Sequence, residues 1–216
     1  GRGGKSQKAA ARGGRPQSSQ GRAAGGGRDN TDPERSNAAA KTQVLLQLLD
    51  QPGPGGGAAH AKEACVRTVV FCNSIESCRQ LENALGRADR KGLKRTVLPL
   101  HAAIPEPARR ASLAAFGRAD RAVLTPMVLV CTDRASRGAD FGGPDAPVGH
   151  VVLFDWPRDP AEFLRRVGRT ARGGGEGRCT ALVVGRQVKV AQRVVDAARS
   201  GRRLSAIDES GPVNKY

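Results

Sequence analysis

The sequence predicts an α/β fold in which a parallel sheet is sandwiched between helices. Short apolar runs alternate along the chain with segments of helical periodicity. The apolar runs are continuous, which is typical of strands covered on both faces, as the strands of parallel sheets are. In such folds the residues that carry chemistry follow the carboxyl ends of the strands.

Five apolar runs are the predicted strands. They are rich in Val, Leu and Phe, and each is followed by polar or helix-starting residues. The runs are residues 68–72, 96–100, 128–132, 151–154 and 180–184. A Pro/Gly-rich stretch at 51–59 is expected to be the loop that precedes the first of them.

Helical patterns separate these runs. Apolar residues at helical spacing begin near Lys41, and further helices are expected at about 75–85, 105–116, 161–167 and 187–199. Asn73 is expected to cap the second helix, with Glu76 as its reciprocal partner three residues later. Pro105 stands near the first turn of the third helix, where proline is tolerated.

Charge is the most unusual feature of the composition. The 216 residues contain 36 Lys and Arg against 20 Asp and Glu, a net charge of +16. Such an excess indicates a polyanionic partner, nucleic acid or an anionic membrane surface. Aromatic residues make up only 3%, so phosphate contacts are expected rather than base stacking. No apolar run approaches the ~18 residues of a membrane-spanning helix.

The two ends of the chain differ from the middle. The first 28 residues hold seven Lys and Arg, no acid and no Val, Leu, Ile or Phe, which predicts a disordered arm. Such an arm either touches RNA or serves as a linker, and both readings stay open. The expected organisation is a Gly/Arg-rich arm at 1–36, a folded domain at 41–200 and a flexible basic and polar tail at 201–216.

Two other kinds of site are not expected. The five cysteines form no CxxC pair and the three histidines no cluster, which argues against a zinc site and a disulfide framework and favours reduced thiols in the core. Gly4-Lys5-Ser6 matches the end of a phosphate-binding P-loop. The earlier glycine of that motif is not present and no amphipathic helix follows, so this match is rejected.

Polar clusters follow four of the predicted strands. Asn73 and Ser74 follow the first, and His101 follows the second, with Arg109 further on. Residues 132–140 follow the third. There Arg137 and Asp140 flank Gly138, either as a nucleotide site with the aspartate on a ribose hydroxyl or as an internal salt bridge.

The fourth cluster has four arginines in eight residues, at 165–172. Arg166, Arg169 and Arg172 recur every third residue, so helical or turn geometry is expected to bring them to one side. Clustered guanidiniums repel one another unless an anion with several oxygens lies among them, and their planar forks suit phosphate. The alternative is a solvated basic face, which the preceding strand and the Asp155-Trp156-Pro157 turn disfavour.

With these clusters in view, residues 41–200 resemble the C-terminal RecA-like domain of a DEAD-box RNA helicase. Residues 71–74 match motif IV, 101–116 the motif that follows, 131–140 motif V and 166–172 motif VI, in the family's order. The amino-acid sequence of motif V is similar to that of plant and algal organelle-type members. An intracellular location, in a chloroplast or mitochondrion, is therefore favoured, although the compartment stays unknown.

The resemblance implies a role for each matching residue. Arg169 and Arg172 would be arginine fingers on the γ-phosphate of ATP, and Arg166 would support the contact between domains. Asp140 would hold the ribose, and Arg137 would link motif V to the catalytic centre. The contacts to the RNA sugar–phosphate backbone, which carry little sequence specificity, would come from Asn73, Ser74, Arg109 and Thr132, with Gly138 allowing close approach.

The resemblance also implies what has to come from elsewhere. ATP and Mg²⁺ would be bound mainly by an N-terminal RecA-like domain in cis, with its P-loop and Asp-Glu-Ala-Asp sequence, and these are absent from this chain. Alone, the chain is expected to bind RNA weakly and not to hydrolyse ATP. Arg165 stands where the family usually has His, Glu106 where Gln is frequent, and Ala102 and Ala171 where Gly is common.

Three functions are compatible with these features. The first is the C-terminal half of an RNA-stimulated ATPase that unwinds short RNA duplexes. The second is a non-enzymatic basic module that binds or anneals RNA. The third is a related helicase acting on DNA. The four motifs favour the first.

Overall fold

The computed structural model describes residues 33–51, 67–118, 125–139, 141, 147–172, 176–202 and 204. The chain divides into two units, residues 1–32 and 33–216, and every described residue belongs to the second. The predicted arm therefore lies outside the described residues up to residue 32, as does most of the predicted tail.

The centre of the second unit is a five-stranded sheet. Its strands are β1 (Arg67–Cys72), β2 (Thr96–Leu100), β3 (Met127–Thr132), β4 (Val148–Leu153) and β5 (Arg178–Ala181). Their order is β2-β3-β1-β4-β5, and every neighbouring pair is parallel. In this register Phe71 lies opposite Cys131 on β3 and Leu153 on β4. The carboxyl ends of β3, β1 and β4 are consequently side by side.

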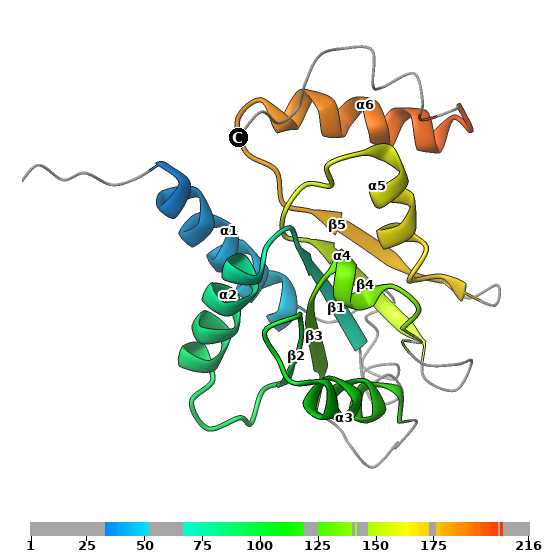
Figure 1. Cartoon of the computed structure of the whole chain (residues 1–216). Helices are drawn as coiled ribbons and strands as arrows, with labels where there is room; N and C mark the ends of the chain where they lie inside the picture. Colours follow the sequence, from blue (N-terminus) through cyan, green and yellow to red (C-terminus); the bar gives the residue numbers. More distant parts are fainter. Residues whose placement is uncertain are drawn as a thin grey trace, which may run out of the picture. The chain divides into compact units, whose positions relative to one another are not determined.

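Helices cover both faces of this sheet, as predicted (Figure 1). They are α1 (Pro33–Asp50), α2 (Ile75–Ala88), α3 (Glu106–Gly117), α4 (Asp133–Ser136), α5 (Pro160–Val167) and α6 (Gln187–Arg199). Leu45 of α1 and Leu81 of α2 belong to the core of one face. Phe116 of α3, Phe163 of α5 and Val194 of α6 belong to the core of the other.

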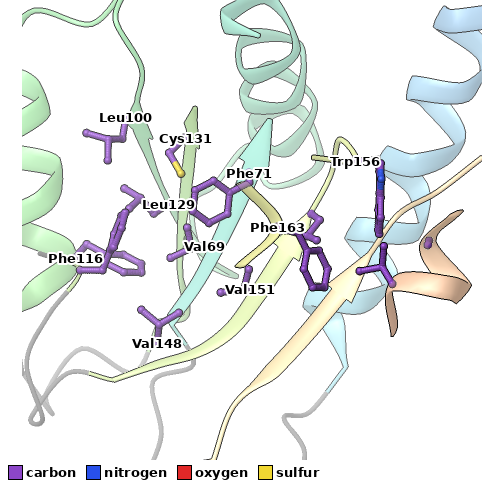
Figure 2. Close-up of a cluster of buried hydrophobic side chains, with 14 of the residues drawn as sticks. Val69, Phe71, Leu100, Phe116, Leu129, Cys131, Val148, Val151, Trp156 and Phe163 are labelled. Atoms are coloured by element: carbon purple, nitrogen blue, oxygen red, sulfur yellow. The ribbon is translucent and has the colours of Figure 1, made fainter. Parts of the chain in front are cut away.

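The central strand explains why the apolar runs are continuous. Val69 and Phe71 point into one core, and Val70 and Cys72 into the other, because successive strand residues face opposite sides. Figure 2 shows the first of these cores, where Phe71 lies among side chains from β3, β4 and α5. Each fully buried Val, Leu or Phe contributes about 1.5–3 kcal/mol, so both faces of this strand stabilise the domain.

Some boundaries differ from the prediction. α1 begins at Pro33 rather than near Lys41, because proline suits the first turn and the three alanines at 38–40 favour helix without an apolar stripe. β5 ends at Ala181 rather than at residue 184. The cap of α2 is Ser74, whose Oγ accepts a hydrogen bond from the Ser77 amide at 3.0 Å, and not Asn73.

Three of the cysteines lie in the core as free thiols, as predicted, whereas Cys179 is exposed and Cys65 lies outside the described residues. Cys72, Cys78 and Cys131 are buried free thiols, and burial raises the pKa of Cys131 well above its usual range. Among the described residues no group of His, Cys, Asp or Glu could hold a metal ion. None of the described helices is both long and apolar enough to span a membrane.

His150 on β4 makes the stability of this fold dependent on pH. Arg178 donates to its Nδ1 at 3.1 Å, so Nε2 carries the proton toward Thr180 Oγ1 at 2.9 Å. Burial and the charge of Arg178 lower the pKa of His150 to about 4, against about 6.5 in an unfolded chain. As the pH falls below about 6.5, His150 is protonated in the unfolded chain but not in the folded state. The free energy of unfolding therefore decreases until the pH reaches the folded pKa of about 4.

We expect the free energy of unfolding to drop by about 2 kcal/mol between pH 7.5 and pH 5 through this residue alone. Urea titrations at both pH values measure it. His150→Gln is the matched control, since the amide keeps a hydrogen-bond partner for Thr180 without titrating. An identical pH dependence in both proteins would exclude His150 as the cause.

Candidate functional site

The guanidinium of Arg166 lies at the carboxyl ends of three strands. Arg166 is on α5, and its side chain is fully buried. Nε donates to Asp133 Oδ1 at 3.0 Å and Nη2 to Asp133 Oδ2 at 2.5 Å. Asp133 directly follows β3 and opens α4. This fork-to-carboxylate geometry is among the strongest hydrogen-bonded pairs in proteins.

The remaining contacts of Arg166 bring in the two other strands. Nη1 donates to the carbonyl oxygen of Asp155, after β4, at 2.7 Å. Nη2 also donates to Oδ1 of Asn73, after β1, at 2.6 Å, and the guanidinium lies 5.5 Å from the centre of the Phe71 ring. Every nitrogen of this side chain therefore has a partner inside the domain.

Asp155 forms a second centre beside Arg166. Its Oδ2 accepts hydrogen bonds from the backbone N–H of Asn73 at 3.0 Å and from the Ser77 hydroxyl at 2.7 Å. Lys41 Nζ, from α1, lies 3.4 Å from Asp155 Oδ1 and donates to the Phe154 carbonyl at 3.0 Å. The Asn73 amide nitrogen Nδ2 donates to the carbonyl of Trp156 at 2.8 Å, so its side chain is engaged at both ends.

Sequence reasoning missed Asp133, Asp155 and Lys41 as members of this site. The two aspartates each stand directly after or close to a predicted strand, which was the available signal. Lys41 had no such signal, because it lies on the helix that precedes the sheet in the chain and meets Asp155 only through the fold.

Arg169 and Arg172 lie beyond the end of α5, Arg169 half-buried and Arg172 exposed. α5 ends at Val167. Arg169 keeps its guanidinium 5.2 Å from the Phe141 ring centre and donates weakly to the Ala139 carbonyl at 3.4 Å. Burial and the neighbouring charge of Arg172 lower the pKa of Arg169. Arg172 is exposed, and its Nε donates to the Gly168 carbonyl at 3.0 Å.

The expectation that Arg166, Arg169 and Arg172 lie on one side is met only in part: Arg166 and Arg169 line one small hollow, whereas Arg172 is exposed and does not line it. Arg166 is the last but one residue of the helix and faces the core, whereas the other two lie beyond the helix end. The predicted role of Arg166 in an interdomain contact stays a prediction.

The turn that carries Arg169 and Arg172 is tightly held. Thr170 Oγ1 donates to the Val148 carbonyl at 2.5 Å. A Cβ at Gly177 would lie 2.1 Å from Thr170 Oγ1 and 2.7 Å from the Ala171 nitrogen, so only glycine fits there. Ala171 has φ +54°, in the left-handed region that favours glycine. The backbone around both arginines is thus set by close packing.

The remaining predicted residues lie along the same edge. Ser74 is exposed, Thr132 is buried at the end of β3, and Arg109 on α3 donates from Nη1 to the Ile104 carbonyl at 2.7 Å. Because β1, β3 and β2 are neighbours in that order, these three side chains follow adjacent strand ends. Before Arg109, His101 is fully buried with Nε2 3.2 Å from Glu82 Oε1.

The motif V residues are only partly described. Arg137 is exposed at the C-cap of α4, and Gly138 has φ +69°, which a larger residue would adopt only with strain. Asp140 lies outside the described residues, so both of its predicted roles stay predictions.

Asp133→Asn tests the buried pair. The amide keeps the shape but leaves the buried Arg166 charge with only the longer contact to Glu162, whose Oε2 lies 3.8 Å from Nη2, so the free energy of unfolding should fall by about 3 kcal/mol. Chemical denaturation measures the change. Glu106→Gln is the matched control, because Glu106 forms an exposed pair with Arg110 at 3.5 Å and should change stability by less than about 1 kcal/mol. Equal effects would contradict the assignment of Arg166 as the central contact.

Part of the chain is similar to a known protein family. The family of the helicase conserved C-terminal domain matches residues 40–174. Among curated proteins, DEAD-box ATP-dependent RNA helicase 50 of Oryza sativa subsp. japonica is 51% identical over 139 residues, 64% of this chain and 21% of that protein. Its namesake from Arabidopsis thaliana is 43% identical over 178 residues, 81% of this chain and 21% of that protein. The chain spans about a fifth of the length of these relatives.

Solved structures share the fold. The second helicase domain of the DEAD-box protein Mss116p, bound to an RNA duplex, has a TM-score of 0.53 at 24% identity, over 76% of this chain and 55% of that one. Mss116p bound to single-stranded RNA and AMP-PNP has a TM-score of 0.57 at 23% identity, over 76% and 28%. The predicted RecA-like architecture is therefore confirmed.

Proposed function

The chain belongs to the helicase conserved C-terminal domain family, in its DEAD-box branch, and from this premise we propose that it is the C-terminal half of an ATP-dependent RNA helicase. RNA would stimulate ATP hydrolysis in the complete enzyme, and closure of two RecA-like domains would separate short duplexes locally. One observation carries the proposal: a closely packed turn carries the half-buried Arg169 and the exposed Arg172, next to an Arg166 whose nitrogens all have partners inside the domain.

Arg169 and Arg172 would act on the terminal phosphate of ATP. In the described part of the chain, Arg169 makes a single long hydrogen bond, to the Ala139 carbonyl, and its other donors suit phosphate oxygens. Guanidiniums placed in advance at a transferring phosphoryl group stabilise the charge that develops there. ATP and Mg²⁺ would be held mainly by an N-terminal RecA-like domain, with Arg137 and Asp140 as further contacts of this chain.

The ends of β1, β3 and β2 would carry the RNA backbone. Ser74, Thr132 and Arg109 follow these neighbouring strands, and contacts of this kind position a strand without reading its bases. Asn73 is assigned a linking role instead, because Arg166 and the Trp156 carbonyl engage both ends of its amide. It would connect the RNA edge to the arginine cluster.

Arg169→Ala tests the catalytic assignment. In a protein that joins this chain to a P-loop-bearing RecA-like domain, kcat for RNA-stimulated ATP hydrolysis should fall by about 10³-fold or more. RNA affinity should hold, since Arg169 is not among the RNA contacts. Arg186→Ala, an exposed arginine at the start of α6, is the control and should leave kcat unchanged. Full activity in the Arg169 variant would refute the mechanism.

A non-enzymatic RNA-binding or annealing module is the second candidate, and the seven cations of residues 1–28 favour it. Replacing all seven by Gln should then make the salt dependence of RNA binding shallower, by about 0.7 in log K per log salt for each lost phosphate contact on a single strand. Filter binding over a range of salt concentrations measures this. An unchanged slope would leave the arm without a role in binding and remove the support for this candidate.

The compartment is a separate proposal. The wording of residues 131–138 supports a chloroplast or mitochondrion. Imaging of the tagged full-length protein in plant cells tests it, and a cytosolic or nuclear signal alone would refute it.

A further inference from the structure

A small hollow lies where α4, α5 and the end of β1 meet. Its volume is about 10 Å³, room for no more than one water molecule. Its lining includes Arg137, Arg165, Arg166 and Arg169 together with Asp133. Figure 1 shows α4 and α5 on the same face of the sheet, which is why residues from both reach one point. Four arginines therefore line one small space.

The charges around this hollow do not balance. Asp133 is its one acidic lining residue, and Arg166 engages both carboxylate oxygens. In the described part of the chain Arg137 and Arg165 have no ion pair, and Arg169 contacts only a carbonyl and an aromatic ring. Among the described residues three like charges thus lack an acidic partner, and an anion placed among them would lower their mutual repulsion.

Arg165 lies where it could contact an anion together with Arg137 and Arg169. Its neighbour Arg166 turns into the core, whereas Arg165 is exposed at the rim. The helix beneath it is fixed: the Asp159 side chain caps α5 through the Glu162 amide at 2.6 Å. At the other end, a Cβ on Gly168 would lie 3.1 Å from the Leu164 carbonyl, so the chain leaves the helix closely packed. Both ends of the helix that carries Arg165 are therefore held by local contacts.

We propose that Arg165 is a further phosphate-binding residue of this chain, contacting with Arg137 and Arg169 the terminal phosphate of a nucleoside triphosphate. The proposal rests on the function proposed above and adds one residue to it. A terminal phosphate offers three oxygens, and each planar fork donates to one or two of them. The competing partner, an acidic side chain on the other RecA-like domain, is an outcome of the test.

The first experiment uses this chain alone with inorganic tripolyphosphate, followed by calorimetry. Arg165→Gln should weaken binding about tenfold, and Arg165→Lys by less, since a charge remains. Arg165→His should bind close to the original chain at pH 6, where imidazolium forms, and about tenfold weaker at pH 8.5. The ratio of variant to original affinity is compared at each pH, which removes the titration of the probe itself.

Arg186→His, the same change at an exposed arginine on α6, is the matched control and should give a ratio near one at both pH values. No binding of tripolyphosphate by the original chain, or a ratio for Arg165→His that does not change with pH, would overturn the proposal. A merely structural role of Arg165 would not produce recovery at low pH.

The second experiment measures KM for ATP in the two-domain protein. The Arg165→His variant should show a raised KM at pH 8.5 and a nearly normal one at pH 6. If Arg169→Ala abolishes hydrolysis while Arg165→His has no effect, the proposed function stands and this inference fails. If Arg169→Ala leaves hydrolysis intact, the proposed function fails and the tripolyphosphate titration still judges Arg165. An effect in the two-domain protein without one on tripolyphosphate binding assigns Arg165 to an acidic group of the other domain and overturns the proposal.

Discussion

One buried guanidinium determines how the strand ends of this domain are arranged. Arg166 joins Asp133 after β3, the Asp155 carbonyl after β4 and Asn73 after β1. An unpaired charge in this position would be prohibitively unstable, because burial removes its hydration. The guanidinium therefore requires its contacts with the Asp133 carboxylate, the Asp155 carbonyl oxygen and Asn73 Oδ1 at the same time. These contacts fix the ends of the three strands relative to one another.

That constraint also shapes the surface. α5 ends one residue after Arg166, at Val167, and the chain turns at Gly168. Thr170 then fastens the turn to the start of β4, and Gly177 lets the backbone approach closely. Arg169 and Arg172 are left at the surface on a backbone that packing has already ordered, so little entropy has to be lost when they meet an anion.

The same contacts connect two edges of the proposed site. Ser74 is exposed and caps α2, while the preceding Asn73 bonds to Arg166. A single hydrogen bond, from Arg166 to Asn73, thus links the proposed phosphate edge to the proposed RNA edge. Lys41 extends the connection to α1 through Asp155, which ties the first described helix to the same centre.

The sequence by itself determined the class of the fold, because buried parallel strands and amphipathic helices leave local patterns. All five strands and the longer helices were predicted, and so was the edge that holds the polar residues. α4 was missed, since four residues are too few for a period, and the start of α1 was misplaced because alanine favours helix without an apolar stripe. Only the tertiary structure decided which arginine turns inward. Because α5 ends between Arg166 and Arg169, the spacing of three could not show that Arg166 is buried while Arg172 is exposed. It also decided that Asp133, Asp155 and Asn73 meet, because strand order, rather than order along the chain, makes their strands neighbours.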